Sequence, residues 1–354
     1  MSILSDFLRL GMPAPRSLLD FAAQAAVLEA SESLPCIAEV LLECRLQSKR
    51  QQVDLSQRLL REQLPQWQRA WALSRPRFHG SEEISNLIER WARDEQWYRL
   101  LKGIWLEFDL AGVDAAPAVF FDIDRSDYDQ PERVIAWMSQ CANLLGIAAD
   151  VKVALFEALR CSALPACSAQ PSYIGLMLSR QPASLRVQFS GLRPNQVLAL
   201  LESVPYLYPV NAIDKAVSLL MNFYDRVVLC VDFAPTLQAR VGLEAFSASL
   251  VPGARLADMI VALEDASLCT REKKAELLAL PYYASPSLEN LNWPEDFVLE
   301  SLLGPEEEVM QIDCRLNHLK LVCNPDKPLE AKAYLAVSNQ HLVTGSDLAA
   351  SASM

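Results

Sequence analysis

The chain has 354 residues, of which 51% are apolar and 21% are charged, and this composition excludes an intrinsically disordered protein. Its 44 acidic residues outnumber its 32 Lys and Arg residues, so the formal net charge is −12 at pH 7. Nucleic acids and anionic membrane surfaces favour basic partners, so we expect neither as the main partner of this protein. The length corresponds to two ordinary domains or to one large domain.

The cysteines predict a reducing compartment. There are nine of them, no C-x-x-C motif occurs, and several lie in apolar runs, as Cys230 does in Val-Val-Leu-Cys-Val. In such runs Cys acts as a small apolar residue, so we expect reduced, buried thiols. The N-terminus lacks the basic and apolar segments of a signal peptide, and no window holds the ~18 uncharged apolar residues of a membrane span. We therefore predict a cytoplasmic protein.

The first part of the chain reads as helical. Apolar residues recur at spacings of three and four, which is the period of an amphipathic helix, at Leu18, Phe21, Ala25 and Leu28 and again at Leu55, Leu59, Leu60, Leu64 and Trp67. Helical spacing also indicates that the tryptophans serve mainly in packing. The prediction is a helical N-terminal region over 1–100, with helix throughout 16–100.

From residue 103 the period changes to that of strands. Four hairpins are predicted, at 104–110 with 118–123, 173–179 with 185–190, 227–233 with 239–246, and 317–323 with 330–337. Helical patterns fill the intervals, at 131–145, 149–160, 194–204, 211–222, 254–265 and 271–279. Pro194 and Thr270 are suitable start residues for two of these helices.

An internal repeat relates the two halves of this region. Arg133-Val-Ile-Ala-Trp-Met aligns with Arg255-Leu-Ala-Asp-Met-Ile, and the same offset places Asp122 on Glu244. We therefore predict an α+β fold in which a hairpin and helix unit is duplicated in tandem. The expected domains are the helical region 1–100, a first repeat over 101–222, a second repeat over 223–340, which contains an insertion around 285–312, and a flexible tail over 341–354.

The predicted strands have one apolar face and one polar face. Trp105, Glu107 and Asp109 share a face opposite Leu106 and Phe108, because successive side chains of a strand alternate. Two arrangements fit this pattern. Two small sheets could abut and leave the polar face in water, or all strands could close into one barrel with helices outside and the polar face inside.

The alternation of helices with antiparallel hairpins resembles the ABBA, or prenyltransferase-barrel, family. The segment His318-Leu-Lys-Leu-Val followed by Ala331-Lys-Ala-Tyr-Leu is similar in kind to strands of that family that carry Lys and Tyr. The resemblance implies a ten-stranded barrel of five αββα units. It also implies that Lys, Arg and Tyr residues hold an allylic diphosphate, while a carboxylate helps to deprotonate an aromatic acceptor.

The candidate site residues all lie on polar strand faces. As catalytic residues we predict Glu107 and Glu244, either of which would orient or deprotonate the acceptor. Arg186, Lys320, Lys332 and Tyr334 would bind an anionic donor. The remaining candidates for substrate binding are Trp105, Asp109, Gln188, Asp232 and His318, although His318 also suits a purely structural role.

Two functions stay open at this point. The first is a transferase that acts on an aromatic or peptide acceptor, with prenyl transfer as the reaction suggested by the resemblance. The second is a non-catalytic module that binds a peptide or a protein partner, by adding a peptide strand to an exposed sheet edge. The sequence contains no glycine-rich phosphate loop and no zinc-binding spacing, so we expect no cofactor and no metal. The oligomeric state is left open.

Overall fold

The structure is a computed structural model of the chain. It describes residues 4–14, 16–36, 39–47, 52–74, 78–110, 116–123, 130–147, 150–162, 170–180, 183–203, 206, 210–234, 236–246, 254–284, 293 and 308–343.

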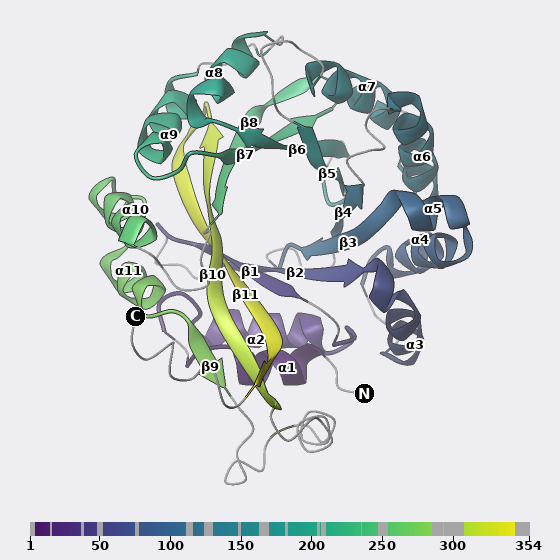
Figure 1. Cartoon of the computed structure of the whole chain (residues 1–354), viewed down its shortest axis with the longest axis horizontal. Coiled ribbons are helices and arrows are strands. Elements are labelled where there is room, and N and C mark those ends of the chain that lie inside the picture. The colour runs from purple at the N-terminus through teal and green to yellow at the C-terminus, as the bar shows by residue number, and fades with distance from the viewer. Residues whose placement is uncertain are drawn as a thin grey trace.

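Ten antiparallel strands close into one barrel (Figure 1). The strands are β1 (Val40–Arg45), β2 (Val53–Leu60), β3 (Leu101–Phe108), β4 (Ala118–Ile123), β5 (Gln170–Met177), β6 (Ser184–Leu192), β7 (Val227–Phe233), β8 (Leu237–Phe246), β10 (Glu308–Asn324) and β11 (Lys327–Val343). Each strand pairs with the next along the chain, and β11 pairs with β1 to close the ring. The short strand β9 (Tyr282–Ala284) adds to β10 through Ile312, Asp313 and Cys314.

Helices lie outside the strands around the barrel (Figure 1). They are α1 (Leu4–Gly11), α2 (Phe21–Ser31), η1 (Arg61–Gln63), α3 (Leu64–Ser74), α4 (Ser81–Arg93), α5 (Glu95–Leu100), α6 (Pro131–Leu144), α7 (Asp150–Ser162), α8 (Pro194–Ser203), α9 (Asn211–Met221), α10 (Ala254–Asp265) and α11 (Arg271–Leu278). None of these described helices is long and apolar enough to cross a membrane.

The hydrophobic core fills the layer between the barrel and the helices. An aromatic contact joins the two layers, because the ring centroids of Phe121 on β4 and Trp137 on α6 are 5.1 Å apart. Trp137 also contacts Trp97 of the neighbouring helix α5, with centroids 5.5 Å apart. Trp67 and Trp91 are also fully buried there, as their helical spacing predicted. Because the helices cover the apolar strand faces, the polar faces are left to the inside of the barrel.

Local signals explain where several helices begin. Pro131 and Pro194 are the first residues of α6 and α8, where proline fits because the first helical N–H needs no partner. The side chain of Thr270 accepts a hydrogen bond from the backbone N–H of Lys273 and caps α11. The start signals predicted at Pro194 and Thr270 are therefore confirmed.

The α+β class and the closed, helix-wrapped barrel are confirmed, and the alternative of two abutting sheets is wrong. The prediction of helix throughout 16–100 is also wrong, because β1 and β2 lie within it and form a fifth hairpin. A spacing of four residues fits one face of a strand as well as one face of a helix. Leu55 and Leu59 were therefore read with the wrong period.

The predicted duplication and its domain boundaries stay predictions. The segments aligned in the sequence form α6 and α10, and the aligned residues Asp122 and Glu244 lie on β4 and β8. Most of the expected insertion at 285–312, and residues 344–354 of the expected tail, lie outside the described residues.

No disulfide bond joins the cysteines that the structure describes. Cys36 is half-buried, and the other six, Cys44, Cys141, Cys230, Cys269, Cys314 and Cys323, are buried. Burial raises the pKa of Cys269 to about 11, so this thiol is protonated at neutral pH. The side chains of Cys161 and Cys167 are outside the described part of the chain.

Candidate functional site

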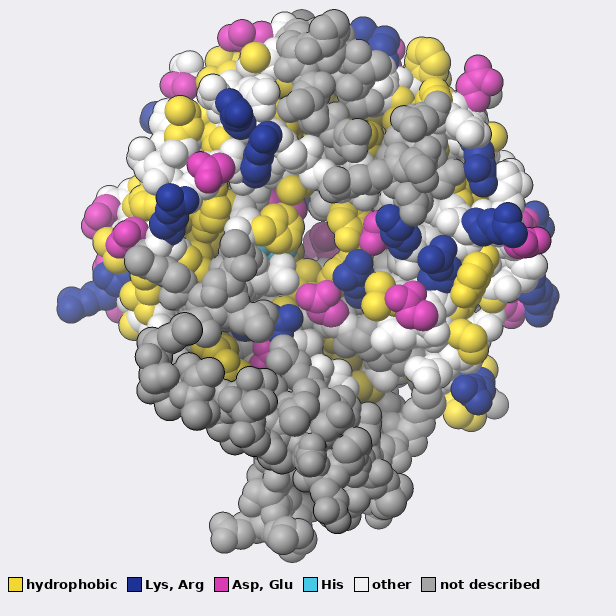
Figure 2. Space-filling view, viewed as in Figure 1, with side chains coloured by type: hydrophobic (Ala, Val, Ile, Leu, Met, Phe, Trp, Pro, Cys, Tyr) yellow, Lys and Arg dark blue, Asp and Glu magenta, His cyan; other side chains and the backbone are white. Residues whose placement is uncertain are grey.

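The lumen of the barrel contains a pocket of about 330 Å³. On the face shown in Figure 2 the surface is hollowed near its centre, and both basic and acidic side chains border the hollow. The pocket is lined by Glu39, Leu41, Ser56, Arg58, Trp105, Glu107, Phe120, Tyr173, Gln188, Glu244, Phe246, Asn317, His318, Lys320 and Tyr334. These residues alternate along their strands with the apolar residues that face the helices.

One side of the lumen, which we call the cationic wall, is formed by β6, β7, β8 and β10. The Lys320 Nζ donates to Glu244 Oε1 at 2.7 Å, and Arg186 donates to both carboxylate oxygens of Asp232 at 2.8 and 3.2 Å. Arg180 pairs with the same aspartate. Arg240 forms no ion pair with another described residue, so four cations on this wall face two carboxylates.

Glycine at position 242 allows the cationic wall to pack. A Cβ atom at Gly242 would lie 2.8 Å from Lys320 Cε and 3.2 Å from Cys230 Cβ. Lys320 therefore lies against the bare backbone of β8, where its ammonium reaches Glu244. A void of about 10 Å³ adjoins Gly242, Arg186, Arg240 and Lys320.

The ion pairs of the cationic wall fix the charge state of its groups. Burial alone would raise the pKa of Glu244, but Lys320 and His318 outweigh that effect and lower it to about 2. Burial opposes the charge of Lys320, yet Cys230 and Glu244 hold the pKa of this lysine above its usual value. Glu244 is thus ionised and committed to Lys320 at neutral pH, which makes it a poor proton acceptor.

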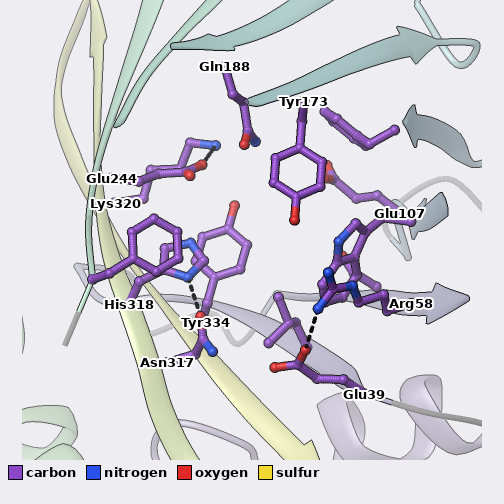
Figure 3. A pocket seen from close by; sticks show the side chains of 15 residues that line it. Glu39, Arg58, Glu107, Tyr173, Gln188, Glu244, Asn317, His318, Lys320 and Tyr334 are labelled. Carbon is purple, nitrogen blue, oxygen red and sulfur yellow. Dashed lines mark hydrogen bonds and ion pairs between the residues drawn. The ribbon is translucent and has the colours of Figure 1, made fainter. Parts of the chain in front are cut away.

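The opposite side, which we call the acidic wall, consists of Glu39, Arg58, Glu107 and Asp122. In a closed ring of ten strands, β3 and β8 are five strands apart and therefore face each other. The Arg58 NH2 group donates to Asp122 at 3.1 Å, and its NH1 group lies 3.6 Å from Glu39. Figure 3 shows Glu107, Arg58 and Glu39 across the pocket from Glu244 and Lys320.

Glu107 differs from the other predicted catalytic carboxylate. Within the described part of the chain its carboxylate accepts no hydrogen bond and forms no ion pair, and it lines the pocket beside Trp105. Its charge nevertheless acts on residues across the lumen, because it contributes to the raised pKa values of Arg186 and Tyr334. Of the two predicted catalytic residues, Glu244 is the one with an ion-pair partner among the described residues.

Aromatic rings line the space between the two walls. The His318 ring stacks on Phe246 and on Tyr334, with centroids 4.5 and 4.1 Å apart. Phe120 packs against Gly175 on the neighbouring strand β5, where a Cβ atom would lie 2.4 Å from the ring. Tyr173 projects into the pocket (Figure 3), and its hydroxyl lies 3.5 Å from Asp122. These ring faces give the pocket a surface that can stabilise a positive charge.

His318 is neutral in this environment. Burial lowers its pKa to about 4, although Glu244 acts in the opposite direction. Its Nδ1 lies 2.8 Å from Asn317 Oδ1, while its buried Nε2 has no hydrogen-bond partner among the described residues. The tautomer that donates from Nδ1 to Asn317 leaves Nε2 as an acceptor.

Tyr334 and Lys332 meet on Glu43. The Tyr334 hydroxyl donates to one carboxylate oxygen of Glu43, and the Lys332 ammonium donates to the other. Burial opposes ionisation of Glu43, but Lys332 and Lys320 outweigh it and hold the pKa of this carboxyl well below its usual value. Lys332 is therefore paired with Glu43, next to the pocket but not on its lining.

Of the predicted site residues, seven line this one pocket: Trp105, Glu107, Gln188, Glu244, His318, Lys320 and Tyr334. Arg186 and Asp232 lie on the cationic wall beside the small void. Asp109 is exposed, just beyond the end of β3. The polar faces of the predicted hairpins thus lie together in the lumen, while Asp109, Lys332, Arg186 and Asp232 lie outside the lining of the 330 Å³ pocket.

Sequence reasoning missed the part of the site that β1 and β2 contribute. Glu39, Glu43, Ser56 and Arg58 were not proposed, because these segments were read as helix. The available signal was the alternation in Val53-Asp-Leu-Ser-Gln-Arg-Leu, which places Ser56 and Arg58 on one strand face. Among the described residues, no three His, Cys, Asp or Glu side chains are placed to share a metal ion.

No protein-family model matches the chain, and no curated protein matches it. Solved structures of prenyltransferases do share its fold. The apo form of prenyltransferase PriB matches with a TM-score of 0.54 and 13% sequence identity, over 94% of this chain and 93% of that chain. The ternary complex of PriB with L-tryptophan and dimethylallyl thiolodiphosphate has a TM-score of 0.53, with the same identity and coverage.

A second prenyltransferase shares this fold. The 5-dimethylallyltryptophan synthase from Streptomyces coelicolor matches with a TM-score of 0.52 and 13% identity, over 94% of both chains. These structures are ABBA prenyltransferases, so the resemblance expected from the sequence is confirmed at the level of the fold. The chain has the ABBA fold: a closed, helix-wrapped β-barrel with a polar and aromatic pocket in its lumen.

Proposed function

We propose that the protein is a transferase that moves an allylic group from a diphosphate donor to an aromatic acceptor. One observation carries this proposal: inside a closed barrel, a cationic wall and an acidic wall face each other across aromatic rings. The prenyltransferases that share the fold, one of them bound to tryptophan and a thiolodiphosphate, support the same class of reaction.

The donor diphosphate would lie against the cationic wall. A lysine ammonium has three N–H donors, and Glu244 uses one of those of Lys320, so the others can bind phosphate oxygens. Arg186 and Arg240 add positive charge beside Lys320. Tyr334 and Lys332 would act from next to this wall, where Lys332 holds Glu43 in place for the tyrosine hydroxyl.

The chemistry follows from this placement. The carbon–oxygen bond of the donor breaks, the diphosphate leaves with the electron pair, and the allylic cation is stabilised by the ring faces of Trp105, Phe120 and Tyr173. The acceptor ring attacks the cation, and Glu107 takes the proton that the acceptor loses. The products are the alkylated acceptor and diphosphate, with one proton passed to Glu107 and then to solvent.

The alternative, a module that binds a peptide at an exposed sheet edge, would have to act outside the closed ring. Each strand of the barrel has a neighbouring strand on both sides, because β11 pairs with β1 as well as with β10. Closure removes free edges from the ring itself, so strand addition would be confined to β9 or to the part of β11 beyond Val337, each of which pairs on one side only among the described strands.

The first test is donor binding and turnover. We expect dimethylallyl diphosphate or its thiolodiphosphate analogue to raise the melting temperature at millimolar concentration, and an aromatic acceptor to trigger diphosphate release. A Lys320→Gln, Glu244→Gln double variant removes both charges of the buried pair and should weaken donor binding by ~10-fold or more. The proposal would be refuted if neither donor raised the melting temperature of the wild type and no diphosphate were released.

The second test separates the two carboxylates. Glu107→Gln keeps the shape of the side chain but cannot accept a proton, so we expect kcat to fall ~100-fold or more while the donor affinity stays within about twofold. Glu244→Gln instead breaks the pair with buried Lys320, so we expect it to lower the melting temperature. If Glu107→Gln kept the wild-type kcat, Glu107 would not be the base.

A further inference from the structure

The acidic wall of the pocket carries an excess of negative charge. Glu39 and Asp122 both interact with the single guanidinium of Arg58, and Glu107 has no partner among the described residues. Among the described residues, three carboxylates therefore face one cation on this side of the lumen. The side chain of Glu39 is 25% exposed, and that of Asp122 is 17% exposed.

The cation on this wall is already shared by two carboxylates. Arg58 is held by Asp122 at 3.1 Å on one terminal nitrogen and by Glu39 at 3.6 Å on the other. Its remaining nitrogen, Nε, is buried and has no hydrogen-bond partner among the described residues. A ligand carboxylate placed here would be the fourth carboxylate around Arg58, the one cation among the described residues of this wall, and like charges in a partly desolvated site repel each other.

The same wall suits a positive charge. The Arg58 guanidinium already lies over the Trp105 ring, 5.5 Å from its centroid, so this part of the pocket holds a cation against an aromatic face. Tyr173 lies on the neighbouring side, beside Asp122. Carboxylates together with aromatic faces are the groups that recognise an ammonium ion.

We propose that the acceptor is a positively charged arylalkylamine without a carboxylate, with its ammonium beside Glu39 and its ring directed toward Glu107. This inference rests on the proposed function, which supplies the aromatic acceptor and places the anionic donor on the opposite wall. Glu39 is then a specificity-determining residue, and Glu107 remains the proton acceptor at the ring.

The test compares ligands that differ only in charge. Binding to the full-length protein is measured by titration calorimetry for tryptamine, the neutral indole-3-ethanol, zwitterionic L-tryptophan and anionic indole-3-propionate, and for the corresponding phenol series. We expect the amine of at least one series to bind ~10-fold more tightly than its neutral and zwitterionic analogues, with the anion weakest. Equal or tighter binding of the amino acid, or no binding of any amine, overturns the proposal.

A pair of matched variants locates the effect. Glu39→Gln should reduce the preference for amine over alcohol to about twofold or less, and leave the affinity for the alcohol unchanged. Glu330→Gln is the control, because Glu330 also pairs with an arginine, Arg45, and its side chain is 34% exposed, but it does not line the pocket. A preference that survives Glu39→Gln, or that Glu330→Gln removes equally, contradicts the assignment to Glu39.

The experiments distinguish a failure of the charge preference from a failure of the proposed transferase function. Binding does not require the donor, so the charge preference can hold even when no diphosphate is released with any acceptor; that result refutes only the transferase. Transfer of the allylic group to the amino acid or the anion, with the amine a poor substrate, keeps the transferase and refutes only the charge preference.

Discussion

At the scale of single residues, the lumen is a set of charges whose partners are distant in the sequence. Arg186 and Asp232 are 46 positions apart, Lys320 and Glu244 are 76 apart, and Lys332 and Glu43 are 289 apart. Strand alternation predicted that many of these side chains share one face. It could not predict which charges meet, because that depends on which strands are neighbours. It therefore could not separate Glu244, which is paired with Lys320, from Glu107, which has no hydrogen-bond or ion-pair partner among the described residues.

The lowered pKa of His318 predicts how the free energy of unfolding depends on pH. Its pKa is about 4 in the folded protein and near 6.5 in an unfolded chain, so between these values the unfolded state binds more protons. His318 therefore contributes full stability above pH 6.5, and this contribution is lost as the pH falls toward 4. The total loss is about 3 kcal/mol at ~1.4 kcal/mol per pKa unit.

Urea unfolding of the wild type and of His318→Gln between pH 7 and 4 measures this contribution. We expect the free energy of unfolding of the variant to fall less steeply over this range, because glutamine does not titrate. Parallel curves for the wild type and His318→Gln would show that His318 does not drive the loss.

At the scale of elements, the hairpins from residue 103 onward were predictable, whereas the first hairpin was not. The later strands contain runs of β-branched and aromatic residues that favour strands, as in Ala118-Val-Phe-Phe-Asp-Ile. The strands β1 and β2 instead contain Leu, Glu, Gln and Arg, which are good helix formers. Tertiary pairing with β3 and β11 decides their structure, and an isolated segment does not carry that information.

The packing of β4 on β5 gives a prediction at this scale. Gly175→Ala would place a Cβ atom 2.4 Å from the Phe120 ring, so we expect a loss of ~1–3 kcal/mol in the free energy of unfolding. Adding Phe120→Leu should recover part of this loss, because the smaller side chain makes room. A double-mutant cycle by chemical denaturation measures the coupling, and additive effects of the two changes would contradict the proposed contact.

At the scale of the whole molecule, the barrel joins the predicted N-terminal region to the rest of the chain. The strand β2 pairs with β3 over six residue pairs, and β1 pairs with β11 over another six. The region 1–100 therefore supplies two of the ten barrel strands. A boundary at residue 100, drawn from the sequence alone, would cut through this continuous sheet.

This gives a prediction for truncation. A chain that begins at residue 101 lacks β1 and β2, so β3 and β11 would each present an unpaired edge. We expect this fragment to aggregate or to lack a cooperative thermal transition by circular dichroism, under conditions in which the full chain unfolds cooperatively. A soluble fragment with a sharp transition would show that residues 101–354 fold as an independent unit.

The facing charges of the lumen also bear on how the strands align during folding. Lys320 lies directly opposite Glu244, Arg186 opposite Asp232, and Tyr334 opposite Glu43. A strand that slipped by one position would turn its charged side chains outward into the hydrophobic core between the barrel and the helices, where they would have no oppositely charged partner. The residues that shape the pocket thereby penalise misaligned barrels, so neutralising several of them together should yield a slower-folding, more heterogeneous protein.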